Sequence, residues 1–148
     1  MMRVVDAETV HRLLDYPSLV EALRELFRRG VDRVDRLGLS EPRPQGGQND
    51  WLLLPAWQFG RHFGAKLVSV FPGNEARGVP SILGLYLLFD GTTGAPLAAI
   101  DGAALTLRKT AANSALAATY LAREDSASLL MVGTPARSCA LRFLCLKI

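Results

Sequence analysis

Apolar and polar positions alternate with a helical period through the first 30 residues. Asp6 is placed to cap a short helix, and Pro17 suits the first turn of a second one. The second helix carries an apolar stripe from Leu19 to Phe27, and Gly30 is a natural stop for this helix. The pattern predicts two helices, with the stripe packed against a sheet or a partner subunit.

The pattern changes from about residue 35 to residue 102, where short aliphatic or aromatic runs are separated by turn residues. The expected strands are 51–54, 63–71 and 82–89. Polar, glycine-containing loops are expected at 44–50 and 71–78, and residues 90–94 read as a hairpin connection. An antiparallel or mixed sheet follows from this arrangement.

A long alanine-rich helix is expected next, capped by Thr106 and running to Ala122. Residues 128–134 then look like a strand that breaks at Gly133, as a strand leading into a dinucleotide-binding turn does. No second or third glycine follows at the required spacing, so the residues alone do not support a dinucleotide site. The predicted class is α/β: an α+β domain with amino-terminal helices, a mainly antiparallel or mixed sheet and a long helix.

The composition is that of an ordinary globular chain of 148 residues, with 49% hydrophobic and 21% charged residues. The 17 basic and 14 acidic residues are spread along the chain, which favours a solvated surface over a nucleic-acid-binding one. No apolar run reaches the roughly 18 residues of a membrane helix, and the early Asp6 does not suit a signal segment. We therefore expect a cytoplasmic protein with no membrane partner. Cys139 and Cys145 lack CxxC spacing and partner ligands, so no metal site is expected.

Several cations are candidates for chemistry. Lys66 interrupts an apolar strand, where an ammonium either points to solvent or binds an anion, because an unpaired buried charge is costly. Arg43 lies between two prolines, and is either a surface arginine or a rigidly presented guanidinium suited to a carboxylate. Arg108 and Lys109 are expected in the first turn of the alanine-rich helix, where cations oppose the helix dipole unless an anion approaches the same end.

A set of sequence blocks is informative as a group. The blocks are LLLPAW at 52–57, GAKLVSVFPGN at 64–74, LFDGTTGAPLA at 88–98, DG at 101–102, LT at 105–106, TAANSALA at 110–117 and LLMVGT at 129–134. Their order and spacing over residues 3–134 resemble those of the ornithine cyclodeaminase/mu-crystallin family. The resemblance implies a substrate-binding and homodimerisation domain followed by a Rossmann domain that holds NAD or NADP. It also implies an amino- or imino-acid substrate, because family members convert ornithine to proline with loss of ammonia, reduce cyclic imines such as pyrroline-2-carboxylate, or interconvert alanine and pyruvate.

The resemblance implies roles for individual residues. Arg43 and Lys66 match positions that contact the carboxylate region of the substrate. Ser81 stands where members often have threonine, near substrate or cofactor, and Gly133 matches the first glycine of the cofactor-binding turn. Lys109 stands where members usually carry an arginine that binds substrate or cofactor. Lysine cannot reproduce the planar two-point contact of arginine, which leaves Arg108 as a candidate substitute.

The resemblance ends after Thr134, since residues 135–148 match nothing in the family and no counterpart of its acidic proton-transfer residue is present. We therefore expect a substrate-binding and dimerisation domain over 1–125, the first strand of a truncated dinucleotide-binding domain over 126–134 and an aberrant tail over 135–148. The resulting hypothesis is an inactive amino-terminal fragment of an ornithine cyclodeaminase-like enzyme, with no catalytic residue of its own. The alternative is a non-catalytic amino-acid-binding or dimerisation module.

Overall fold

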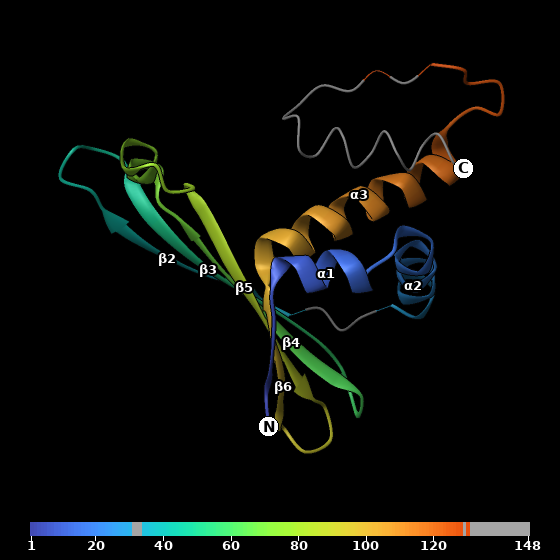
Figure 1. Cartoon of the computed structure of the whole chain (residues 1–148), viewed down its shortest axis with the longest axis horizontal. Helices are drawn as coiled ribbons and strands as arrows, with labels where there is room; N and C mark the ends of the chain where they lie inside the picture. Colours follow the sequence, from blue (N-terminus) through green and yellow to red (C-terminus); the bar gives the residue numbers. More distant parts are fainter. Residues whose placement is uncertain (31–33, 129, 131–148) are drawn as a thin grey trace. The chain divides into compact units, whose positions relative to one another are not determined.

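The computed structural model describes residues 1–30, 34–128 and 130 (Figure 1). Its elements are, in chain order, β1 (Arg3–Val5), α1 (Ala7–Leu13), α2 (Tyr16–Arg29), β2 (Leu37–Pro42), β3 (Gln48–Gln58), β4 (His62–Val70), the 3-10 helix η1 (Pro72–Arg77), β5 (Ile82–Asp90), β6 (Pro96–Asp101) and α3 (Gly102–Leu121). The chain forms two compact units. Of the described residues, the sheet unit comprises 1–10 and 34–103, and the helical unit comprises 11–30 and those from Ala104 onward.

The sheet unit is built on one six-stranded sheet with the order β1-β6-β5-β4-β3-β2. β1 pairs with β6 in parallel, and every other neighbouring pair is antiparallel. The predicted α/β class with a mixed sheet is therefore confirmed. The predicted hairpin at 90–94 is also present, because the Asp90 carboxylate accepts hydrogen bonds from the backbone N–H groups of Thr92 and Thr93 at 2.9 and 2.8 Å.

The strand β3 is longer than the sequence pattern predicts. Residues 48–50 were expected in a loop, but they form the first three residues of β3 and pair with β2. Their polar side chains are accommodated on the sheet because Asp50 accepts hydrogen bonds from the Ser40 hydroxyl at 2.5 Å and from the Gln48 amide at 2.8 Å. Polar residues that hydrogen-bond to one another across an edge strand do not show the alternation of apolar and polar positions by which a strand is predicted.

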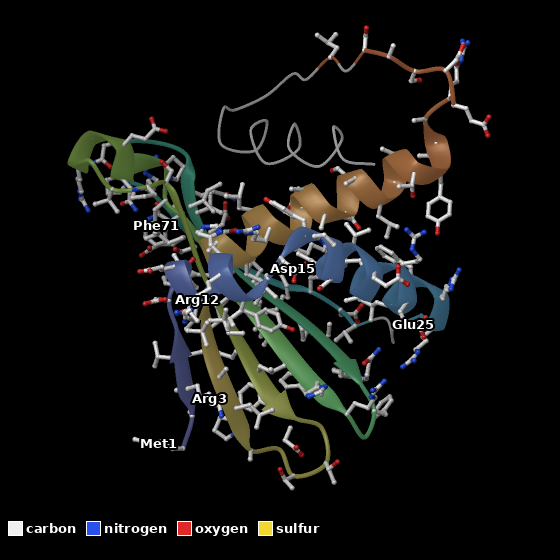
Figure 2. The ribbon with its side chains drawn as sticks, turned by 45° about the vertical axis from the view of Figure 1, so that its right-hand side comes forward. Met1, Arg3, Arg12, Asp15, Glu25 and Phe71 are labelled. Carbon is white, nitrogen blue, oxygen red and sulfur yellow. The ribbon has the colours of Figure 1, made fainter. Side chains whose placement is uncertain are left out.

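Helix α2 of the helical unit begins and ends where its sequence predicts. The Asp15 carboxylate, labelled in Figure 2, accepts the backbone N–H of Ser18 at 3.0 Å, and Pro17 lies in the first turn. Gly30 ends the helix with φ of 74°. The apolar stripe was expected to pack against a sheet or a partner subunit. In the structure its residue Leu23 packs instead with Ala112 and Leu116 of α3. The small alanine side chains of α3 allow this close helix packing.

Helix α3 begins at Gly102, four residues before the predicted cap at Thr106. The helix starts without an intervening turn after β6, so Thr106 lies inside it. Arg108 and Lys109 consequently lie in the second turn, and the expected opposition between these cations and the helix dipole does not arise. None of the described helices is long and apolar enough to span a membrane.

Candidate functional site

Four strands of the sheet unit bring two loops to the same end of the sheet. β2 ends at Pro42 opposite Gln48, where β3 begins, and β4 ends at Val70 opposite Ile82, where β5 begins. Asp50 pairs with Val70, so the loop 43–47 and the segment 71–81 lie at the same end of the strands. Phe71, labelled in Figure 2, marks this end.

Arg43 is fixed by its own loop. Its backbone N–H donates to the Gly47 carbonyl and its carbonyl accepts the Gly46 N–H, both at 3.0 Å. Gly46 and Gly47 have φ of 86° and 75°, which glycine adopts without strain, and this allows the loop to close tightly. The Arg43 side chain is half-buried, in contrast to the expectation for an ordinary surface arginine.

The segment opposite Arg43 is held by hydrogen bonds to its own flanks. The Phe71 N–H donates to the Ser81 carbonyl at 2.7 Å, and the Asn74 side-chain amide donates to the Pro80 carbonyl at 3.2 Å. Gly78 ends η1 in the left-handed region with φ of 68°. The 3-10 turn therefore closes on the start of β5 and forms a fixed wall.

The two loops enclose a pocket of about 570 Å³. It is lined by Arg43, Pro44, Gln45, Asn49, Phe71, Gly73, Asn74, Ala76 and Arg77. Two arginines, three residues with side-chain amides and one aromatic residue thus line the same pocket. Guanidinium groups bind carboxylates through paired hydrogen bonds, so the arrangement suits a small organic acid with an apolar body.

Lys66 occupies the middle of the sheet, between Leu54 on β3 and Tyr86 on β5. It is half-buried. Its Cε lies 3.8 Å from the position that a Cβ would take at Gly84, whereas the Tyr86 ring covers Gly64 in the opposite direction. Burial raises the pKa of the Tyr86 hydroxyl. Because Gly84 pairs with Val68, the lysine chain leans toward the pocket end of the sheet, although Lys66 is not among the residues that line the pocket.

The comparison with known proteins decides the family. The sequence profile of the ornithine cyclodeaminase/mu-crystallin family matches residues 1–147, so the match extends past Thr134, where the resemblance was expected to end. This chain belongs to that family. A Δ1-pyrroline-2-carboxylate reductase of Colwellia psychrerythraea is 35% identical to it over 135 residues, which cover 90% of this chain and 42% of the relative.

Solved structures agree with the family assignment. An archaeal alanine dehydrogenase dimer with bound NAD superposes with a TM-score of 0.82 at 28% identity, covering 97% of this chain and 45% of the other. A Thermococcus litoralis Δ1-pyrroline-2-carboxylate reductase in complex with NADH and L-proline gives a TM-score of 0.77 at 26% identity, with coverage of 99% and 46%. The chain thus spans about two fifths of the length of the curated relatives it matches.

The remaining family positions lie elsewhere in the described structure. The Ser81 hydroxyl donates a long hydrogen bond of 3.4 Å to Glu75, and this side chain does not line the pocket. Lys109 is exposed on α3, in the helical unit. Gly133, predicted to bind cofactor, lies outside the described residues, as do Cys139, Cys145 and most of the predicted strand 128–134.

Arg108, the candidate substitute for the family arginine at position 109, has contacts with His11 and Tyr16. Its Nη2 donates to the His11 carbonyl at 2.6 Å and its Nε donates to His11 Nδ1 at 3.0 Å. The guanidinium also lies 4.5 Å from the centre of the Tyr16 ring. These three contacts hold α3 to His11 of α1 and Tyr16 of α2, so the Arg108 guanidinium is engaged within the helical unit.

Sequence reasoning missed the η1 contribution to the pocket. Gly73, Asn74 and Arg77 were assigned to a polar loop without any role. A usable signal was present, since this loop carries an arginine and follows directly on the strand that holds Lys66.

Proposed function

We propose that the pocket between the 43–47 loop and η1 binds the carboxylate of a cyclic imino acid, and that this chain supplies the substrate side of an NAD(P)-dependent reductase. The observation that carries the proposal is the half-buried Arg43, fixed by its loop and facing a pocket that Arg77 also lines. A carboxylate is the complementary group for such a pair of guanidiniums.

The charge of the pocket favours a cyclic imino acid over ornithine. Ornithine carries a second ammonium, which needs an anionic partner when it leaves water. Among the described residues that line the pocket, two are arginines and none is a carboxylate. Pyrroline-2-carboxylate has no such distal cation, and reductases of this compound are among the relatives.

We assign supporting roles to three further residues. Lys66 would add a third cation toward the carboxylate, because its chain leans to the pocket end of the sheet. Ser81 would contribute a hydroxyl at the mouth of the same end, and Lys109 a cation on the cofactor side. These two roles rest on the family positions rather than on a contact within the pocket.

The cofactor requires residues beyond those described. Glycines of residues 1–128 do not follow the GxGxxG spacing, so this part of the chain does not by itself fit a dinucleotide. We propose that residues 1–125 form the substrate-binding and dimerisation domain and that NAD or NADP binds in a domain that begins near residue 126 and includes Gly133. Bound there, the nicotinamide would supply the hydride for imine reduction.

An apolar face of the sheet supports self-association. Leu37, Leu39, Trp51, Leu83 and Leu85 are each between 40% and 59% exposed. The strand register places all five on the same face of the sheet unit. A contiguous apolar face of this kind usually marks an interface, so we propose that the chain forms a homodimer through it.

The proposed function is tested by titrating the 148-residue chain with L-proline and with L-ornithine and following backbone amide signals by NMR. We expect L-proline to bind and to shift signals of the 43–47 loop and η1, with ornithine binding at least tenfold more weakly. An Arg43→Met variant should lose at least tenfold in L-proline affinity, because a charged hydrogen bond contributes about 1.5–3 kcal/mol.

Arg61→Met is the matched control, since Arg61 lies in the β3–β4 turn at the opposite end of the sheet. Preferential binding of ornithine, or equal effects of the two substitutions, would refute the proposal. An assay of pyrroline-2-carboxylate reduction with NADH then separates a reductase from a module that binds its ligand without turnover.

A further inference from the structure

The Arg43 guanidinium lies directly against Gly73. A Cβ placed on Gly73 would be 2.8 Å from Arg43 Nη2, 3.4 Å from Cζ and 3.8 Å from Nε. Real Cβ atoms essentially never approach another heavy atom within 3.0 Å. The guanidinium therefore occupies the space that a side chain at position 73 would take.

The backbone does not explain this glycine. Six described glycines have a positive φ, which favours glycine, but Gly73 is not among them. It lies at the start of η1, between Pro72 and Asn74, where alanine is a better helix former. Alanine would instead disturb the contact with Arg43, because the three heavy atoms nearest to that Cβ position all belong to the Arg43 side chain.

We infer that Gly73 is a positioning residue: its missing side chain fixes where the Arg43 guanidinium presents its donors to the bound carboxylate. The backbone of Arg43 is already held by the two hydrogen bonds with Gly46 and Gly47, so the remaining freedom lies in the side chain. Because Gly73 has no Cβ, the guanidinium can lie directly against the backbone at this position, a placement that a side chain would exclude. The inference rests on the proposed function for the carboxylate, but the position of Arg43 is measurable without any ligand.

The effect of adding a methyl group follows from these distances. In Gly73→Ala the guanidinium must move by several tenths of an ångström or change rotamer, because Nη2 is closer than an ordinary contact of 3.4 Å or more. Binding sites tolerate errors of only about 0.5 Å in the groups that contact a ligand. The disturbed atoms belong to the end of a flexible side chain, so the fold should be retained while ligand affinity falls about tenfold.

The test uses four forms of the 148-residue chain: wild type, Gly73→Ala, Arg43→Ala and the double variant. The NMR signal of the Arg43 Nε–H group reports the position of the guanidinium, and titration with L-proline reports affinity. We expect the Arg43 signal to shift in Gly73→Ala and the affinity to fall about tenfold. In the Arg43→Ala background, the Gly73→Ala substitution should have no further effect on affinity, because it acts through Arg43.

Gly38→Ala is the matched control. Gly38 also lacks a positive φ, and a Cβ there would meet only Leu52 Cδ2 at an ordinary 3.6 Å. It should leave both the Arg43 signal and L-proline binding unchanged. An unshifted Arg43 signal in Gly73→Ala, an equal loss of affinity in the Arg43→Ala background, or an unfolded Gly73→Ala chain would each overturn the inference. A wild-type chain that does not bind L-proline would instead refute the proposed function, and the Arg43 signal would still decide the role of Gly73.

Discussion

Replacing Gly102 by alanine sets two physical effects against each other. Gly102 is the first residue of α3, and alanine is favoured over glycine in a helix by about 1 kcal/mol. A Cβ at this position, however, would overlap the carbonyl carbon of Gly84 and lie 2.5 Å from its oxygen and 2.8 Å from the Leu85 nitrogen. All three atoms belong to the backbone of β5, so no side-chain rotation relieves the overlap.

The overlap should prevail over the helix preference. Overpacking a well-packed site costs about 1–3 kcal/mol, and the upper end applies because a strand and a helix must separate. Subtracting the helix gain of about 1 kcal/mol leaves a loss of about 2 kcal/mol in the free energy of unfolding. For a chain of this size the loss corresponds to a fall in Tm of about 4–8 °C.

Urea denaturation followed by circular dichroism measures this loss. Gly38→Ala serves as the control, since its Cβ has room in an edge strand and should change stability by less than about 0.5 kcal/mol. A Gly102→Ala chain as stable as wild type, or more stable, would refute the reasoning, because that is the result expected from helix propensity alone.

Three further predictions concern stability. Gly64→Ala should lower the free energy of unfolding by about 1–3 kcal/mol because its Cβ would overlap the Tyr86 hydroxyl, and the cost should shrink in a Tyr86→Leu background, as measured by urea denaturation of the four forms. Arg108→Lys should cost about 1 kcal/mol in the same assay, since lysine cannot make both hydrogen bonds to His11; equal stability of the two chains would contradict the role given to Arg108. Hydrogen bonds from backbone N–H groups hold the pKa of Asp90 below its ordinary value of 3.8, so the stability that Asp90 contributes is present above pH 3.8 and is lost as the pH falls through the lowered pKa. Asp90→Asn should therefore be less stable than wild type at neutral pH, and the gap between the urea midpoints of the two chains should narrow in acid.

Much of the fold could be predicted from local patterns. The cap at Asp6, the first-turn Pro17, the stop at Gly30 and the hairpin at 90–94 depend on residues a few positions apart, and the structure contains all of them. The start of α3 was placed too late in the sequence. Its first residue, Gly102, lies against the backbone of Gly84 in β5, where a side chain would not fit. A contact of this kind leaves no trace in the periodicity of the helix.

The candidate site shows the same division. Arg43 and Lys66 were candidates because of their positions, one between prolines and the other within an apolar strand, and the family resemblance implied their role. Gly73 and Arg77 were missed because nothing local shows that η1 faces the 43–47 loop. The contact between Arg108 and His11 could not be predicted, because His11 lies 97 residues away in the sequence.

The register of the central strands links these observations to function. Tyr86 and Lys66 are direct partners, yet their side chains leave each other in opposite directions, each over a glycine of the neighbouring strand. The Tyr86 ring over Gly64 blocks one direction, and the lysine chain lies against Gly84 in the other. A slip of one residue between β4 and β5 would move Lys66 to the other face and remove both glycine surfaces. The two glycines therefore do more than tolerate large neighbours: they make one register, and one direction for the Lys66 ammonium, more stable than the alternatives. The strand pairing therefore turns the Lys66 chain toward the pocket end of the sheet, before any ligand is bound.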